Sequence, residues 1–325
     1  MRIGGSGVSH GRQSAGGWVS VDGVEIGFAA PVSGSWATVD NLVRVATRAE
    51  ELGYRSLWTM QRLLSPPDGS WGAAYRSVLD PVATLAFLAA HTSRVRLGVA
   101  VINMPFYAPA LLAKQLATVD LLCAGRLDVG LGIGWADEEY TAVGVDKAAR
   151  GKRAEEYLPL LRRCWTDDVV EHHGAFYEVP ASRMEPKPAQ PGGPPVLLGA
   201  AAEPALRRAG RLADGWVSSS RADLATIGQS VRVVRAAAEE AGRDPDSLRM
   251  VCRGAVRVRD NAARRPLTGT FEQVRADFGA LAEQGVTELF VDLNFDPEIG
   301  SPDADPVAAM ERAEAALEAF APGRR

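Results

Sequence analysis

The chain contains few of the side chains on which several classes of enzyme depend. Only four of its 36 basic residues are lysines (Lys114, Lys147, Lys152 and Lys187), and none of them closes a predicted strand. An enzyme with a Schiff-base lysine at a barrel mouth is therefore not expected. The three cysteines lie far apart without a CxxC pair, which is typical of a reducing cytoplasm and of a protein without structural zinc.

Histidine is also scarce, with four residues in the chain. His91 ends a predicted helix, while His172 and His173 lie in a predicted hairpin, so neither a histidine metal site nor a catalytic triad is expected. The sequence also lacks a GxxxxGK(S/T) phosphate loop and a GxGxxG dinucleotide fingerprint. No apolar run is long enough to cross a membrane, and the net charge of −4 argues against nucleic acid as the main partner. We therefore expect a small-molecule substrate as partner, with no nucleic acid and no membrane.

One strand has an unusual composition, in the stretch GRLDVGLGIGWADEEY over residues 125–140. From Val129 to Gly134, large apolar residues alternate with glycines, which is the period of two expected of a strand. One whole face of this strand is therefore glycine. Because glycine weakens a strand, such a row indicates the close approach of either a ligand or a neighbouring strand. The residues alone leave both alternatives open.

The order of predicted elements indicates the fold. Eight predicted strands, each followed by a predicted helix, indicate a single (β/α)8 TIM barrel of the α/β class over residues 23–325. These strands cover residues 24–30, 55–60, 95–102, 129–134, 196–200, 215–219, 248–258 and 286–293. Long insertions follow the second, fourth and seventh strands at the C-terminal face, where barrel enzymes have their sites. Residues 1–22 are rich in glycine and serine, and we expect a flexible N-terminal extension there.

Several segments occur together in the order typical of one enzyme family. They are AEELGYRSLW (49–58), DPVATLAFLAAHTSRVRLG (80–98), LLAKQLATVDLLCAGRLDVGLGIGW (111–135), RMEPKPAQ (183–190), ALRRAGRLADGW (205–216) and GTFEQV (269–274). With them the chain resembles the luciferase-like monooxygenase superfamily, and more narrowly its branch dependent on the deazaflavin coenzyme F420. Relatives that use FMN share most of these motifs. The resemblance thus implies a barrel that holds F420, or alternatively FMN, at its C-terminal mouth.

The resemblance also implies which residues bind the cofactor, at the ends of three strands. They are Ala100, Val101 and Asn103 on the third strand, Gly134, Trp135 and Glu138 after the fourth, and Gly199, Ala200 and Ala201 after the fifth. In relatives the third strand bulges against the cofactor ring at a non-proline cis peptide, which here would join Ala100 and Val101. The turn after the fifth strand grips the cofactor phosphate in relatives, although Gly199 could also be an ordinary strand-ending glycine.

The chain departs from the family pattern after the second strand. Many deazaflavin relatives have an Asp-His or Glu-His pair there, with histidine as acid or base, whereas this chain has Gln61 and Arg62. Arginine stays protonated and cannot act as an ordinary base. We expect Gln61 and Arg62 to contact substrate, with Arg62 contributing charge; the alternative is a solvated loop arginine. No catalytic residue is assigned. The acidic run 137–139 could supply a carboxylate or form a solvated helix face.

F420 differs from FMN in having an acidic tail, which arginine is suited to bind. Basic residues gather around the fifth strand, at Arg183, Lys187, Arg207, Arg208 and Arg211. They favour F420 over FMN, unless the three arginines at 207–211 form a solvated helix face.

The leading interpretation is a cytoplasmic, homodimeric oxidoreductase that moves a hydride between F420 and a small organic substrate. Three alternatives stay open at this stage. The chain could be a monooxygenase that uses reduced FMN and oxygen, or a non-catalytic flavin or deazaflavin carrier. A cofactor-free aldolase or isomerase is disfavoured, because no lysine or histidine is expected at the mouth.

Overall fold

The computed structural model describes residues 20–260 and 263–323. Within these residues, eight parallel strands pair side by side, and the last of them pairs with the first to close a barrel. In barrel order the strands are β2 (Val24–Ala29), β3 (Ser56–Thr59), β4 (Arg96–Asn103), β5 (Leu127–Gly132), β8 (Val196–Gly199), β9 (Gly215–Val217), β10 (Arg249–Ala255) and β13 (Glu288–Asp292). The predicted (β/α)8 TIM barrel is confirmed, and each strand lies within a few residues of its expected position.

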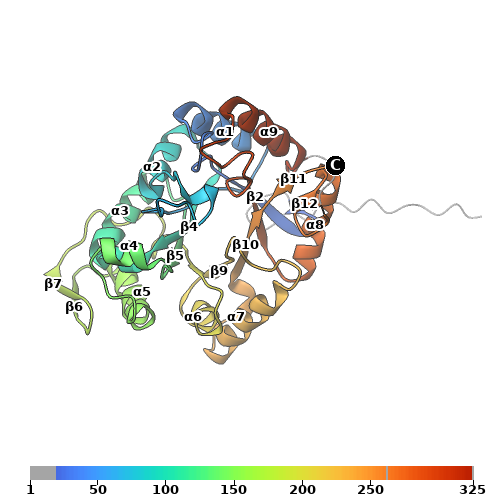
Figure 1. The fold of residues 1–325 in the computed structure, drawn as a ribbon. Coiled ribbons are helices and arrows are strands. Elements are labelled where there is room, and N and C mark those ends of the chain that lie inside the picture. Colours follow the sequence, from blue (N-terminus) through green and yellow to red (C-terminus); the bar gives the residue numbers. More distant parts are fainter. Residues whose placement is uncertain (1–19, 261–262, 324–325) are drawn as a thin grey trace, which may run out of the picture.

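Helices surround the barrel (Figure 1). They are α1 (Val39–Glu51), α2 (Pro81–His91), α3 (Pro109–Leu122), α4 (Asp137–Ala142), α5 (Arg150–Thr166), α6 (Glu203–Leu212), α7 (Gly228–Glu240), α8 (Phe271–Glu283) and α9 (Pro306–Ala319). Local sequence sets several of their starts. Asp80 accepts a hydrogen bond from the backbone N–H of Ala83 at 2.9 Å, and Pro81 occupies the first position of α2. Thr270 and Gln273 form a capping box at the start of α8.

Several short elements lie outside the barrel. The predicted hairpin is present as β6 (Val170–His173) and β7 (Glu178–Ser182), at the edge of the molecule in Figure 1. Beyond β10, β11 (Arg257–Val258) pairs with β12 (Thr268–Gly269). The strand β1 (Ser20–Val21) pairs antiparallel with β2 and lies within the stretch 1–22 expected as an extension. Residues 1–19 of the expected extension lie outside the described residues.

Most of the hydrophobic core lies between the strands and the helices, and a second, smaller cluster fills the barrel interior. Inside the barrel, Trp58 stacks on Phe290 with ring centres 5.1 Å apart. A Cβ at Gly98 would lie 2.6 Å from the Trp58 ring, so this glycine makes room for the indole. The interior is thus a packed core, as expected for an eight-stranded barrel.

A continuous chain of ion pairs fills the layer nearest the strand N-termini. Three arginines alternate with three acids: Arg55 with Glu25 and Glu288, Arg249 with Glu288 and Asp128, and Arg96 with Asp128. Burial by itself raises the pKa of Asp128, but the guanidinium groups of Arg249 and Arg96 hold that pKa well below its usual range. This layer closes the end of the barrel opposite the mouth, which leaves the C-terminal end for a ligand.

Candidate functional site

The strand β4 bulges near its C-terminal end. Its register with β5 shifts between Val99 and Ile102, and the peptide bond between Ala100 and Val101 is cis, as the resemblance predicted. Asn103 follows and is buried, and its backbone N–H donates to the side-chain oxygen of Gln61 at 2.8 Å. The bulge therefore shapes the barrel mouth, and Gln61 is one of the residues that hold it.

The glycine row of β5 accommodates this bulge. A Cβ at Gly130 would overlap the carbonyl oxygen of Val99, and one at Gly132 would lie 2.5 Å from Val101 Cγ2. On the next strand, a Cβ at Gly199 would lie 2.7 Å from Val101 Cγ1. The Val101 side chain is therefore seated against two glycines. Close approach of a neighbouring strand, one of the two alternatives for the glycine row, is confirmed at Gly130 and Gly132.

Gly134 and Trp135 continue from β5 to the mouth. Gly134 has a positive φ of +69°, which L residues rarely adopt, and a Cβ there would lie 3.4 Å from the Asn103 side chain. The turn at Gly134 brings Trp135 over the mouth, where its side chain is 44% exposed. Both predicted positions therefore lie beside the bulge of β4.

Arg253 of β10 crosses the interior beneath the mouth. Its Nε donates to Asp292 Oδ2 at 2.7 Å, and its Nη1 donates to the carbonyl oxygen of Ala100 at 2.9 Å. The guanidinium carbon also lies 4.6 Å from the ring centre of Phe295. Arg253 thus links two strands on one side of the barrel to the bulge on the other. Sequence reasoning missed this residue, although the period of two in β10 places Arg249, Val251 and Arg253 on one face.

Arg62 and Glu139 form a buried ion pair above the bulge. Nη1 of Arg62 lies 3.1 Å from Oε2 of Glu139, and the two side chains are 7% and 0% exposed. Oε1 of Glu139 accepts hydrogen bonds from the backbone N–H groups of Leu63 and Leu64, at 2.8 and 3.2 Å. The alternative of a solvated loop arginine is therefore wrong. The run at 137–139 is not wholly a solvated face either, because Glu139 points inward.

Three aromatic side chains enclose the same guanidinium. Its carbon lies 5.1, 4.7 and 4.7 Å from the ring centres of Trp71, Tyr75 and Trp135. We call Arg62, Glu139 and these three rings the mouth cluster. Burial lowers the pKa of Arg62, and the nearby Glu139 carboxylate opposes this shift. Cation–π contacts of this kind strengthen as they are desolvated, so the mouth cluster holds Arg62 in one place.

The mouth cluster contains polar atoms without a hydrogen-bond partner. Within the described chain, Nε and Nη1 of Arg62 and Oε2 of Glu139 are buried and make no hydrogen bond. Nη1 and Oε2 are near each other, but their geometry does not satisfy a hydrogen bond. Buried polar groups are rarely left in this state, and a polar ligand at the mouth would satisfy them.

The turn after β8 is the third predicted contact. The backbone oxygen of Ala200 accepts a hydrogen bond from Nε1 of Trp216 at 2.9 Å, which anchors the turn. Ala201 and Ala202 are exposed, and Ala202, at the N-cap of α6, offers no side-chain cap. Pro204 has no N–H, and Ala205 already donates to the carbonyl oxygen of Ala202. The N–H of Glu203 is therefore the donor of the first turn that could meet an anionic group of a ligand.

Glu138, expected at the cofactor, lies on the exposed face of α4, while its neighbour Glu139 reaches the mouth. The helix starts at Asp137, and successive side chains point about 100° apart around a helix. Because all three residues of this run are acidic, no pattern of apolar residues indicates which one faces inward. The missed residue is therefore adjacent to the expected one.

Four of the five basic residues expected to hold an acidic tail have partners within the chain, and the fifth, Arg183, is exposed. All three arginines of α6 pair with glutamates of other helices: Arg208 and Arg211 with Glu155, at 2.9 and 3.0 Å, and Arg207 with Glu240. Lys187 donates to backbone oxygens at the C-terminal end of α5, which lies away from the mouth. These contacts weaken the argument from the acidic tail, and the preference for F420 over FMN stays a prediction.

The remaining expectations concern histidines, metals and membranes. His172 bonds to Glu156, and His173 bonds to Glu171 and Glu178, all outside the mouth. Residues 20–260 and 263–323 contain no group of three or more potential ligands that could hold a metal ion. No helix in that same part of the chain is long and apolar enough to cross a membrane.

Comparisons with known proteins give related sequences. The profile of a family described as luciferase-like monooxygenase matches residues 24–266. An uncharacterized protein of Mycobacterium tuberculosis is 31% identical over 289 residues, which cover 83% of this chain and 90% of that protein. An F420-dependent glucose-6-phosphate dehydrogenase of Amycolatopsis mediterranei is 33% identical over 184 residues, 55% of this chain and 53% of that enzyme.

A flavin-dependent relative and a solved structure are also similar. The oxygenase component of a flavin-dependent trigonelline monooxygenase of Acinetobacter baylyi is 29% identical over 163 residues, 50% of this chain and 43% of that protein. The crystal structure of a monooxygenase from Streptomyces bottropensis superposes with a TM-score of 0.75 and 22% identity, over 92% of this chain and 98% of that one. This structural likeness shows the fold alone.

Proposed function

The chain belongs to the luciferase-like monooxygenase family, and we propose that it is an oxidoreductase that moves a hydride between F420 and a small organic substrate. One observation carries the proposal: the Val101 side chain packs against Gly132 and Gly199. This residue of the bulge is half-buried and lies at the mouth. A flat cofactor ring suits such a surface. The F420-dependent relative supports the deazaflavin as the cofactor.

The residues at the mouth fit such a cofactor. Nε of Arg62 is a buried donor without a hydrogen bond, and Nη1 has only its ion pair with Glu139; such donors suit the carbonyl oxygens of a flavin-type ring. The exposed turn at Ala201 and Ala202, with the N–H of Glu203, is where the cofactor phosphate would lie. When bound, the cofactor supplies the hydride chemistry, and the protein supplies orientation and electrostatics.

The chain's own part is to bind, to orient and to exclude water. Trp71, Tyr75 and Trp135 shield the mouth, and Arg62 contributes a fixed positive charge without taking a proton. Both ends of the Gln61 amide are hydrogen-bonded within the chain. Its oxygen accepts from the backbone N–H of Asn103, and its NH2 group donates to Tyr107 Oη at 2.8 Å. A substrate whose conversion needs no resident histidine is therefore favoured. A cytoplasmic homodimer stays a prediction from the family resemblance.

Two alternatives keep specific support. The flavin-dependent relative favours a monooxygenase that uses reduced FMN and oxygen, since FMN also has a phosphate and a flat ring. A non-catalytic carrier is favoured by the absence of histidine after β3, where Gln61 and Arg62 both have structural contacts.

A turnover screen tests the proposal and separates it from the alternatives. The purified protein is mixed with oxidised F420 and a panel of alcohols, aldehydes and organic acids, and the loss of deazaflavin absorbance is followed. A parallel screen supplies reduced FMN and oxygen and follows oxygenated product. We expect turnover with F420. Turnover in the FMN screen alone would favour the monooxygenase, and binding without turnover in either would favour the carrier.

A further inference from the structure

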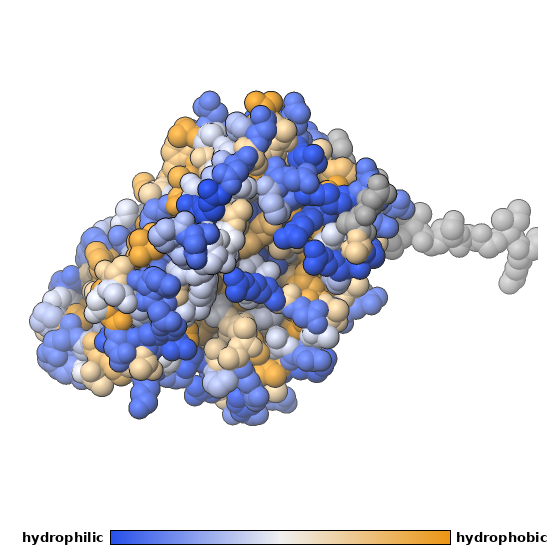
Figure 2. All heavy atoms as spheres, viewed as in Figure 1, coloured by the Kyte–Doolittle hydropathy of each residue, from blue (hydrophilic) through white to orange (hydrophobic). Residues whose placement is uncertain are grey.

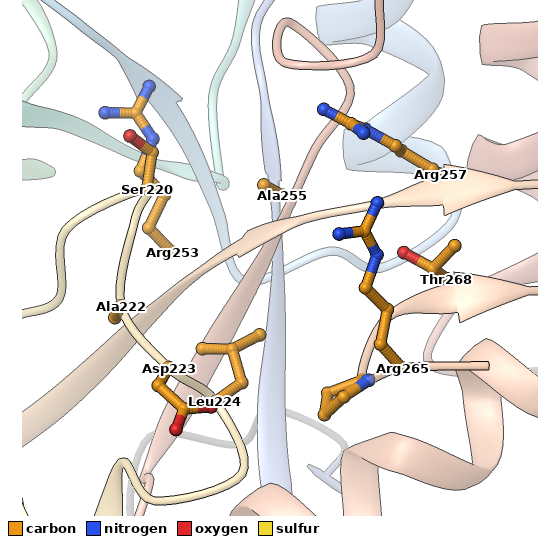
Figure 3. A pocket seen from close by; sticks show the side chains of 10 residues that line it. Ser220, Ala222, Asp223, Leu224, Arg253, Ala255, Arg257, Arg265 and Thr268 are labelled. Atoms are coloured by element: carbon orange, nitrogen blue, oxygen red, sulfur yellow. The ribbon is translucent and has the colours of Figure 1, made fainter. Parts of the chain in front are cut away.

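A cavity of about 260 Å³ opens on the side of the mouth formed by β9, β10 and β12. Figure 3 shows Arg257, Arg265 and Thr268 on one side of it and Ser220 and Asp223 on the other. A second cavity of about 320 Å³ shares Ser220 and Arg257 with the first and extends toward the mouth cluster. In Figure 2 strongly hydrophilic residues gather over this side of the mouth.

Backbone pairing brings two of these arginines together. Arg257 pairs with Thr268 between β11 and β12, and its N–H donates to the carbonyl oxygen of Leu267 at 3.0 Å. Thr268 in turn forms a bridge to Arg265. Arg221, which follows β9, lines the second cavity and lies over the ring of Trp135 at 5.5 Å. Three arginines from two loops therefore converge on two adjacent cavities, which share lining residues and are taken together as one site.

These three arginines differ from their neighbours in having no acidic partner. Nearby arginines do have acidic partners: Arg253 pairs with Asp292, Arg259 with Asp296 and Glu298, and Arg264 with Asp277. Among the described residues, no carboxylate lies within ion-pair distance of Arg221, Arg257 or Arg265.

The first cavity holds one carboxylate, and local contacts occupy it. Oδ1 of Asp223 accepts from the N–H of Ala225, and Oδ2 accepts from the hydroxyl of Thr226, at 3.1 and 3.0 Å. Asp223 keeps its negative charge, but the three arginines outnumber it, and the net positive charge around the cavities favours an anion there.

We propose that these adjacent cavities bind an anionic group of the substrate, a carboxylate or a phosphate, through Arg257 and Arg265 with Arg221 at the entrance. Arginine suits both groups, because its planar fork donates two hydrogen bonds to either. The proposal rests on the proposed function and narrows its substrate to organic acids or phosphate esters.

The location fits a substrate subsite beside the cofactor. Arg253 lines the first cavity and also donates to the carbonyl oxygen of Ala100 on the bulge. A molecule anchored at Arg257 therefore extends toward the surface of the bulge, against which the cofactor ring is proposed to lie. The acidic tail of F420 is the other possible source of an anion, and the experiment must distinguish the two.

The test compares wild type with Arg257→Gln, Arg265→Gln and the double variant. Arg44→Gln is the control, because Arg44 is an exposed arginine on α1 and its loss removes the same charge. Calorimetry measures the binding of inorganic phosphate and of succinate to protein without cofactor, and fluorescence measures the binding of F420 and of FMN. Circular dichroism confirms that each variant is folded. Arg257→Lys, which keeps the charge, serves as a second variant.

We expect the double variant to bind phosphate or succinate at least about tenfold more weakly, with Arg44→Gln unchanged and Arg257→Lys in between. F420 and FMN should bind all variants within about twofold of wild type, because the proposed cofactor contacts lie elsewhere. Anion binding that does not change in the double variant would overturn the proposal. A parallel loss of F420 affinity with FMN affinity kept would assign the arginines to the cofactor tail instead. Wild-type protein that binds neither cofactor would contradict the proposed function, whatever the result with anions.

Discussion

Nη1 of Arg253 donates to the carbonyl oxygen of Ala100, 2.9 Å away on the far side of the barrel interior. The arginine is buried together with Asp292, and Asp292 also accepts from the backbone and side chain of Asn294 at 3.0 Å. One ion pair thus connects β10 and β13 to the bulge of β4. The shape of the mouth depends on this contact as well as on the strands themselves.

Replacing Arg253 with methionine should destabilise the protein by about 3–5 kcal/mol, because Asp292 is left buried without its cation. Changing Asp292 to asparagine in the same chain should recover part of this loss, because no unpaired charge stays inside the barrel. Urea unfolding measures both values. If the single variant loses less than about 1 kcal/mol, Asp292 has found another partner and the pair does not hold the mouth.

Two adjacent glutamates provide a matched comparison at the mouth cluster. Glu139→Gln leaves Arg62 buried without a counter-charge and should cost about 3–5 kcal/mol of unfolding free energy. Glu138→Gln changes an exposed side chain on the same helix and should change stability by less than about 0.5 kcal/mol. Equal effects of the two substitutions, measured by urea unfolding, would contradict the inward orientation of Glu139.

The glycines beside the bulge should differ in how they respond to added methyl groups. Gly132→Ala crowds the Val101 side chain and should cost about 1–3 kcal/mol. Val101→Ala in the same chain removes the crowding methyl groups and should recover most of that cost. Gly130→Ala meets the backbone carbonyl of Val99, so Val101→Ala should not rescue it. Thermal unfolding of the five proteins, including wild type, checks this pattern, and rescue of both glycine variants would contradict it.

The ion pairs at the closed end of the barrel predict an acid-dependent loss of stability. The pKa values of Asp128 and Glu288 lie below their usual range. Burial raises both pKa values, but nearby arginines lower them by more: Arg249 acts on both acids, Arg96 on Asp128 and Arg55 on Glu288. Groups with lowered folded pKa values stabilise fully above their usual pKa of about 4, and the stabilisation is lost as pH falls below it. Asp128→Asn should be less stable at pH 7 and should show a flatter dependence on pH between about 5 and 3. If the slope of unfolding free energy against pH is the same in Asp128→Asn and wild type, the ion pairs of Asp128 do not contribute to the pH dependence of stability.

The strands were predictable because their signals are local, whereas the bulge of β4 was predicted from the family resemblance alone. Period-two alternation, caps such as Asp80 and the glycine row all lie within short segments of sequence. The orientation of Glu139 was not predictable, because it depends on where α4 begins. The partners of the α6 arginines were not predictable either: Glu155 and Glu240 lie on other helices, and only the folded barrel brings them into contact.

The central claim is that the mouth binds a deazaflavin and that Arg62 is part of its site. The most direct measurement is a fluorescence titration of wild type and Arg62→Ala with F420 and with FMN. We expect wild type to bind F420 more tightly than FMN, and Arg62→Ala to lose at least about tenfold in affinity for both cofactors. Tighter binding of FMN would favour the flavin monooxygenase. Undiminished binding of both cofactors to a folded Arg62→Ala variant would contradict the placement of the site at the mouth cluster.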